Sequence, residues 1–190
     1  MKIQDLVEKN RTRRRFDQDH KIKSDLLEKL VNLGRLSPSG ANRQPLKYII
    51  VNEPGICSRV FPYTAWAAYL KDWPGPGEGE RPTAYIIVLG DRSVSENFGV
   101  DHGIAAQSIM LGAVEEGLGG CIIASLKKDG LRAELKIPDQ YEILLVLAIG
   151  KPVEEVVIEE INNGDVKYWR DGNKVHHVPK RSLDEIILKL

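Results

Sequence analysis

The chain has 190 residues, 42% of them hydrophobic, which is enough to bury the core of one domain and too few for two full ones. Lysine plus arginine and aspartate plus glutamate both number 27, so no net charge attracts nucleic acid or an anionic membrane. The two cysteines lie outside any CxxC pair, which argues against a disulfide framework. The start of the chain is charged, unlike a signal peptide, and the longest apolar run has seven residues, too few to span a membrane. We therefore expect a cytoplasmic protein that forms one domain over residues 1–190.

The first predicted element is a short helix with apolar residues at Ile3, Leu6 and Val7, which ends where an arginine run begins. Arg11 to Arg15 contains four arginines and one hydroxyl within five residues. Such a set of forked donors suits a phosphate group, although a charge run is also typical of a solvated helix end.

A second helix is predicted from Ser24, which can cap it, with a buried face made by Leu26, Leu27, Leu30 and Val31. The polar stretch Ser37 to Pro45 follows and reads as a helix stop and a turn. It directly precedes a predicted strand, Leu46 to Val51, which Asn52, Glu53 and Pro54 bring to an end.

A short helix is predicted over 63–70, before a segment that is too rich in proline and glycine for regular structure. Residues 71–82 contain three prolines and three glycines and indicate a surface loop or lid. The strand predicted over 84–89 comes next, and the longest helix is expected over 98–116, ended by Gly117. Small residues on this helix favour close helix packing, either between two chains or within a core.

Two further strands are predicted over 119–124 and 141–150, the second apolar on both faces as expected for a central strand. Segments 166–170 and 174–178 flank Asp171, Gly172 and Asn173, a hairpin signal. The final helix starts with a capping box, Ser182 with Glu185. This alternation predicts an α+β or mixed α/β protein with helices around a central sheet.

The motifs of several enzyme classes are absent from the sequence. It has no GxSxG elbow, no HExxH, no Walker loop and no glycine-rich strand-to-helix turn for a dinucleotide. His176 and His177 are adjacent and face opposite sides of a strand, so no metal site is expected, and they are interpreted with His20 and His102 as ordinary polar residues. The absence of an evident acid, base or nucleophile favours a cofactor that carries the reaction.

Five segments, in this order, resemble the nitroreductase family of FMN-dependent oxidoreductases. Residues 10–16 (NRTRRRF) resemble the family's RRSxRxF, with Asn10 in place of an arginine, and residues 37–46 (SPSGANRQPL) resemble its APSxxNxQPW. Residues 117–125 (GLGGCIIAS) are similar to GLGSCWIGG, residues 147–152 (LAIGKP) to xxxxGYP, and residues 179–185 (PKRSLDE) to RKPLEE.

The resemblance implies where FMN binds. Arg11 and Arg14 would hold its phosphate with Lys180 and Arg181, and Thr12 would add a hydroxyl or backbone contact, while Arg13 would compensate for Asn10 or face solvent. Main-chain N–H groups within 122–125 would approach flavin N5. The implied cofactor-binding residues are Arg11, Thr12, Arg13, Arg14, Pro38, Ser39, Gly40, Asn42, Gln44, Ile122, Ile123, Ala124, Ser125, Lys180 and Arg181.

The resemblance also implies a fold and a reaction. The fold would be an α+β sandwich with a central, mostly antiparallel sheet flanked by helices, forming a homodimer that packs through the long helix and exchanges terminal segments. NAD(P)H would reduce FMN, and a nitroaromatic, a quinone or a similar small acceptor would then be reduced in a ping-pong cycle. Candidates for the substrate entrance lie next to the second segment or the proline-rich loop, namely Arg43, Trp66, Tyr69, Lys71 and Trp73.

Two other functions fit the same residues. One is a non-catalytic FMN-binding store or redox sensor, and the other is a specialised reaction on the same fold, such as reductive dehalogenation, flavin fragmentation or ring desaturation. Nucleic-acid binding by the arginine run is less favoured, because the sequence has no aromatic residues between the arginines and no second basic stripe.

Overall fold

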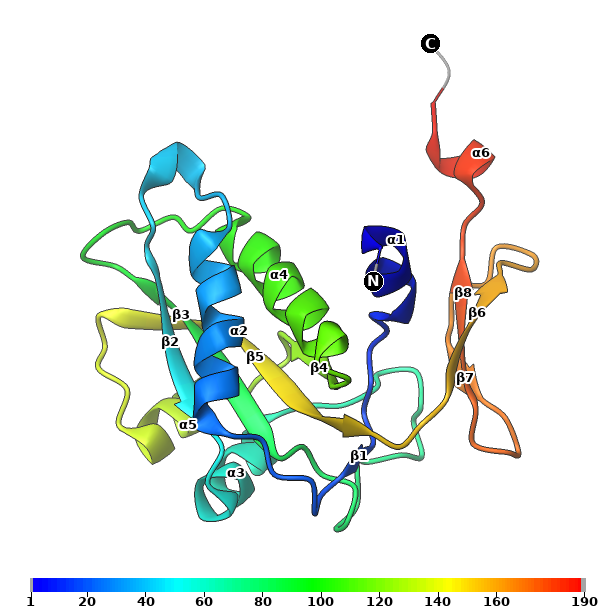
Figure 1. The fold of residues 1–190 in the computed structure, drawn as a ribbon, viewed down its shortest axis with the longest axis horizontal. Helices are drawn as coiled ribbons and strands as arrows, with labels where there is room; N and C mark the ends of the chain where they lie inside the picture. Colours follow the sequence, from blue (N-terminus) through cyan, green and yellow to red (C-terminus); the bar gives the residue numbers. More distant parts are fainter. Residues whose placement is uncertain (1, 189–190) are drawn as a thin grey trace.

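The computed structural model describes residues 2–188, most of which surround one central sheet (Figure 1). Its strands are β1 (Phe16–Asp17), β2 (Leu46–Val51), β3 (Ala84–Asp91), β4 (Gly119–Ile123) and β5 (Tyr141–Pro152). The order is β1-β5-β3-β2, β4 also pairs with β5, and all four pairings are antiparallel. The predicted class, an α+β protein with a mostly antiparallel central sheet, is confirmed.

Helices cover both faces of this sheet because its two central strands are apolar on both sides. Along β3 the even-numbered residues from Ala84 to Val88 face one cluster and the odd-numbered residues from Tyr85 to Leu89 face another. The first cluster includes α2 (Ser24–Leu36) and α4 (Asp101–Glu115), and the second includes α3 (Pro54–Val60) and α5 (Lys128–Leu135).

Two glycines allow α2 and α4 to approach closely. A Cβ atom on Gly112 would lie 2.3 Å from Leu33 Cδ1, and one on Gly34 would lie 2.9 Å from Ile109 Cδ1. The small residues of α4 therefore serve packing within the chain. They give no separate support for contact between chains.

The prediction of a helix over 63–70 is wrong. The helix of this region is α3, which begins at Pro54 and is followed by a 3₁₀ helix, η2 (Phe61–Tyr63). Pro54 was interpreted only as the end of the preceding strand, yet proline also suits the first position of a helix. Ser24 is likewise the first residue of α2 and not its cap, and its Oγ accepts a hydrogen bond from Asn52 Nδ2 (3.0 Å).

The chain beyond β5 forms an arm beside the main sheet (Figure 1). It contains β6 (Val156–Glu160), β7 (Trp169–Arg170), β8 (His176–Lys180) and α6 (Leu183–Ile186), and its strands form a separate sheet in the order β6-β8-β7. The predicted hairpin is confirmed by the antiparallel β7–β8 pair, and the predicted cap by Ser182 Oγ, which accepts from the Glu185 N–H (3.3 Å). The helix α5 and the strand β6 were not predicted.

The N-terminal helix α1 (Ile3–Lys9) lies against α4, to which Asn10 Nδ2 donates at Gln107 Oε1 (3.3 Å). Within residues 2–188, no helix has the length and apolar character needed to cross a membrane.

Candidate functional site

The arginine run lies along the free edge of β4. Arg13 N donates to Gly120 O (2.8 Å), and Thr12 forms a parallel bridge with the same glycine. A Cβ atom on Gly119 would lie 3.0 Å from Arg13 Cγ and 2.9 Å from Pro152 Cγ, so the glycine permits this close approach. The first and third family-like segments are thus brought together within one chain.

A cavity of about 260 Å³ opens where β4 ends. Its wall includes Arg14, Trp66, Tyr168 and the segment 121–125. Six predicted site residues therefore share one cavity, namely Arg14, Trp66, Ile122, Ile123, Ala124 and Ser125. Ala124 and Ser125 are small and exposed, which leaves the backbone at the end of β4 open to a flat ligand.

Arg14 is buried at the edge of this cavity. Its guanidinium lies over the Tyr168 ring, 4.8 Å from the centroid, and its Nη1 is 3.2 Å from His176 Nε2. Burial and the neighbouring Arg14 lower the pKa of His176 to about 4, so at neutral pH the imidazole is uncharged and can accept from the arginine. His176 is therefore a buried contact of the site and not the ordinary polar residue that was expected.

Glu154 holds the backbone of the arginine run in place. It was not among the residues predicted from the sequence. Its side chain is 1% exposed and accepts hydrogen bonds from the backbone N–H groups of Arg14 and Arg15, the second at 3.2 Å. It also pairs with Arg170 Nη2 on β7 (3.2 Å). One carboxylate thus fixes both the backbone of the run and the C-terminal hairpin.

The other arginines of the run have partners within the chain. Arg11 Nη2 donates to Val7 O (2.8 Å), Arg13 Nη1 donates to Glu154 O (2.7 Å), and Arg15 forms an ion pair with Glu80. Burial lowers the pKa of Arg13, whereas the hydrogen bond that Arg15 donates to Glu80 raises the pKa of Arg15. The four arginines therefore do not form one continuous fork.

The second family-like segment lies at the opposite end of α4. Ser39 Oγ donates to Asp101 Oδ2 (2.6 Å) and Gly40 N donates to Asp101 Oδ1 (2.9 Å), and Asp101 is the first residue of α4. The helix has 15 residues and is about 22 Å long. Its other end leads through Gly117 into β4, so one chain holds the two halves of the predicted site well apart.

The backbone of this second segment is strained. Ala41, Asn42 and Gln44 have φ values of 50°, 54° and 53°, in the left-handed region that favours glycine. The 3₁₀ helix η1 (Gly40–Asn42) contains the first two, and Gln44 Nε2 donates to Asn42 Oδ1 (3.2 Å). Each such residue costs on the order of 1–3 kcal/mol, and strain of this kind clusters at ligand-binding sites. Pro38 and Arg43 are exposed beside it.

Lys180 and Arg181 lie at the far end of β8. His176, at the start of this strand, contacts Arg14, and the four residues to Lys180 span about 13 Å. Arg181 pairs with Glu185 on α6. The structure of one chain therefore does not bring these two cations to the cavity at Arg14.

The predicted entrance residues do not all lie at one place. Trp66 lines the cavity, Tyr69 packs on Tyr168 with ring centroids 5.0 Å apart, and Trp73 lies under Arg170 at 4.6 Å. Lys71 is exposed in the proline-rich loop. Tyr168, which lies in the first arm of the predicted hairpin, was not among the predicted site residues.

The residues of the cavity fit a flat anionic cofactor such as FMN. In the described part of the chain, Nε of Arg14 is buried without a hydrogen-bond partner, and so is Nε of Arg11 at the start of the run. Aromatic side chains, Trp66 and Tyr168, line the same space. The volume of about 260 Å³ is below the range of roughly 300–1,000 Å³ that is usual for ligand sites, so a second surface would be needed to enclose the cofactor.

The neutral state of His176 predicts a pH dependence of stability. Its pKa is about 4 in the folded chain and about 6.5 when unfolded, so the unfolded chain takes up the proton first as pH falls. We expect the parent protein to lose about 2 kcal/mol more stability between pH 7 and pH 5 than a His176→Gln variant does. Urea denaturation of both proteins at the two pH values measures this difference, and equal losses would contradict the assignment.

Three kinds of comparison relate the chain to known proteins. The sequence model of the nitroreductase family matches residues 7–151. A protein of Methanothermobacter thermautotrophicus, described as a candidate NADH dehydrogenase/NAD(P)H nitroreductase, is 28% identical over 159 residues, which cover 79% of this chain and 78% of that protein. A similarly described protein of Archaeoglobus fulgidus is 25% identical over 149 residues, covering 74% of this chain and 80% of that one.

Solved structures have the same fold. A nitroreductase family protein of Clostridium difficile 630 superposes with a TM-score of 0.64 at 25% identity, covering 80% of this chain and 86% of the other. A family member from Streptococcus pneumoniae TIGR4 covers 100% of both chains with a TM-score of 0.70 at 16% identity. A candidate nitroreductase of Exiguobacterium sibiricum 255-15, solved in complex with FMN, has a TM-score of 0.66 at 18% identity, covering 80% of this chain and 89% of that one.

Proposed function

This chain belongs to the nitroreductase family, and from that membership we propose that it is an FMN-dependent NAD(P)H oxidoreductase that acts as a homodimer. Residues 1–190 would serve as a single FMN-binding domain. The acceptor would be a nitroaromatic, a quinone or a similar oxidised molecule. A cytoplasmic location stays a prediction.

The separation of the two predicted half-sites carries this proposal. The half that contains Arg14 and residues 122–125 lies beside β4, and the half that contains Ser39 and Asn42 lies at the other end of α4. A second copy of the chain, placed with α4 against α4 in the opposite direction, would set each half beside its complement. The incomplete cavity of one chain supports the same arrangement.

The exposed C-terminal segment supports exchange between the two chains. Leu183, Ile186, Ile187 and Leu188 are between 55% and 84% exposed at the end of the arm. When several apolar side chains close together in the chain are this exposed, they indicate a surface that another molecule covers. Packing on the partner would bury them, and would also carry Lys180 and Arg181 toward the partner's cofactor.

Each residue of the site would have a defined task. Arg14, with Arg11 and the Lys180–Arg181 pair, would neutralise the anionic part of the cofactor, and the backbone at residues 122–125 would lie against its ring. Glu154 would position Arg14 through its backbone N–H, and the neutral His176 would position it through Nη1. Neither forms an ion pair with the guanidinium, so its charge stays available to the ligand. The chemistry that FMN supplies when bound is transfer of two electrons from NAD(P)H to an oxidised acceptor.

The cavity measures only about 260 Å³, so donor and acceptor would occupy the same place in turn. Trp66 would contact a planar substrate there. This geometry predicts ping-pong kinetics, in which the oxidised nicotinamide leaves before the acceptor binds.

The proposal is tested by purification, spectroscopy and kinetics. The protein should be yellow and release about one FMN per chain on denaturation, and double-reciprocal plots against NAD(P)H at several quinone concentrations should be parallel. Intersecting lines would indicate one site that binds both substrates together. Retention of FMN without reduction by NADH or NADPH would instead favour a flavin store or sensor.

A further inference from the structure

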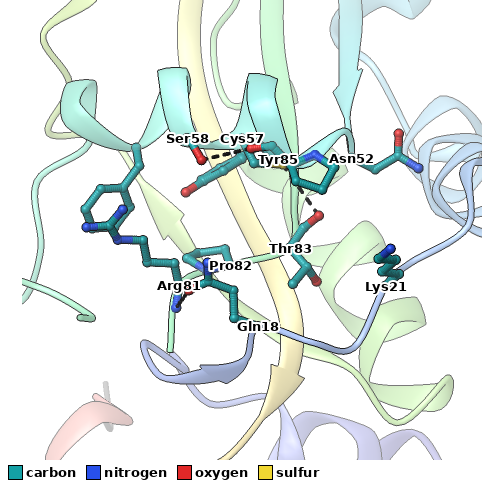
Figure 2. Close-up of a pocket in the computed structure, with 11 residues that line it drawn as sticks. Gln18, Lys21, Asn52, Cys57, Ser58, Arg81, Pro82, Thr83 and Tyr85 are labelled. Carbon is teal, nitrogen blue, oxygen red and sulfur yellow. Dashed lines mark hydrogen bonds between the residues drawn. The ribbon is translucent and has the colours of Figure 1, made fainter. Parts of the chain in front are cut away.

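A second cavity, of about 80 Å³, lies between the segment before α2, helix α3 and the start of β3 (Figure 2). It shares no lining residue with the cavity at Arg14. Cys57, Ser58 and Tyr85 lie on one side of it in Figure 2, and Gln18, Arg81 and Pro82 lie on the opposite side. Lys21 and Asn52 also line it, and Lys21 is exposed.

The charge of this cavity is positive. Arg81 and Lys21 line it, no carboxylate does, and neither cation forms an ion pair within the described residues 2–188. Arg81 lies over the Phe61 ring, 4.5 Å from the centroid, which holds its guanidinium at the wall. Burial raises the pKa of the Cys57 thiol to about 11, so this side chain adds no negative charge at neutral pH.

Three buried polar atoms on the residues of this wall have no hydrogen-bond partner among residues 2–188. They are Arg81 Nε, Thr83 Oγ1 and Tyr85 Oη, and Tyr85 is fully buried. An unpaired buried donor is costly, and native proteins leave few of them. All three can donate to an oxygen atom, and the residues that carry them line the cavity.

The backbone before β3 is held so that these donors stay in place. Gln18 Oε1 accepts from the N–H groups of both Gly79 (2.9 Å) and Arg81 (3.1 Å). The Gln18 amide is thereby oriented, and its Nε2 donates no hydrogen bond to the residues that the structure describes. Apolar surface from Phe61, Pro82 and Cys57 fills the remainder of the wall.

We propose that this cavity is a binding site for a small aliphatic carboxylate, of about the size of propionate. The carboxylate would be held by Arg81 and the Tyr85 hydroxyl, which lie toward the same end of the cavity in Figure 2, because an anion repays the burial of both donors at once. The short carbon chain would lie against Phe61, Pro82 and the Cys57 thiol. The donors and the apolar wall together favour a carboxylate over an inorganic anion, which has no apolar part.

The binding test uses the purified protein with excess FMN, so that a phosphate site for the cofactor is filled. Propionate should bind saturably in calorimetry and raise the melting temperature, whereas propionamide, its uncharged analogue, should do neither. Inorganic phosphate at the same ionic strength should bind more weakly. Tighter binding of phosphate, or equal binding of propionamide, would overturn the carboxylate assignment.

Two variants locate the site. Arg81→Gln should weaken propionate binding at least about tenfold, and Arg92→Gln, an exposed arginine paired with Glu142 elsewhere, should leave it unchanged. Tyr85→Phe should weaken binding while leaving the ligand-free melting temperature equal or higher, because it removes an unpaired buried hydroxyl. If propionate affinity is the same in Arg81→Gln and Tyr85→Phe as in the parent, or if only water fills the cavity in a propionate-soaked crystal, the proposal is wrong.

Discussion

Glu154→Ala is expected to lower the free energy of unfolding by about 3 kcal/mol, because it breaks a buried ion pair and leaves the remaining partners unsatisfied. The Glu154 carboxylate accepts from Arg14 N, Arg15 N and Arg170 Nη2, and within residues 2–188 these three donors have no other acceptor. Urea denaturation measures the loss. Affinity for FMN should fall as well, since the same carboxylate fixes the arginine run.

Two controls separate the buried carboxylate from its surroundings. Glu155→Ala changes the exposed neighbour and should alter stability by less than about 0.5 kcal/mol. Glu154→Gln keeps the shape and one acceptor oxygen, so its loss should be intermediate. A Glu154→Ala protein as stable as Glu155→Ala would show that the network at Arg14 does not hold the site together.

Arg14→Gln is expected to weaken FMN binding at least about tenfold while the protein remains folded. A charge-assisted hydrogen bond contributes roughly 1.5–3 kcal/mol, which corresponds to a tenfold to hundredfold change in affinity. Glutamine preserves a donor toward His176 and, unlike glutamate, adds no negative charge beside the buried Glu154. Fluorescence titration of the apoprotein with FMN gives the affinity.

Arg92→Gln is the matched control for this variant, because Arg92 is exposed, pairs with Glu142 and does not line the cavity at Arg14. Its FMN affinity should equal that of the parent. If Arg14→Gln also binds FMN as the parent does, the anionic part of the cofactor binds elsewhere, and the proposed role of the buried guanidinium is wrong.

The sheet could be predicted because its pattern is local. Runs such as 84–89 and 141–150 are apolar at every position, which is typical of strands covered on both faces, and the structure confirms them as β3 and β5. The helix over 63–70 failed for a local reason too, since Pro54 ends one element and starts the next. Helix α5 has one buried residue, Leu131, too weak a stripe to be recognised.

The site was harder to predict, because its parts meet through contacts between distant residues. The family-like segments identified Arg14 and residues 122–125, and the structure places them in one cavity. Glu154 and Tyr168 were missed because a glutamate after a strand and a tyrosine in a hairpin have no local signature. Their roles follow from pairing with Arg14, 140 residues from Glu154 along the chain.

The central claim is that each FMN site is built from two chains, and the structure shows how to test it with mixed dimers. One chain carries Arg14→Gln. The other carries Asn42→Asp and Gln44→Glu, two exposed residues at the opposite end of α4 whose side chains contact each other. Ser125 is left unchanged, because it lines the same cavity as Arg14 and its substitution would damage the same half of the site.

The measurement is the FMN content of purified heterodimers with different affinity tags, at an FMN concentration between the dissociation constants of the parent and the variants. If the halves come from different chains, one site of each heterodimer contains both unaltered halves and the other contains both altered ones. We then expect half the FMN content of the parent dimer, although each variant homodimer is nearly empty. A heterodimer as empty as the variant homodimers would show that both halves belong to one chain, and would contradict the account.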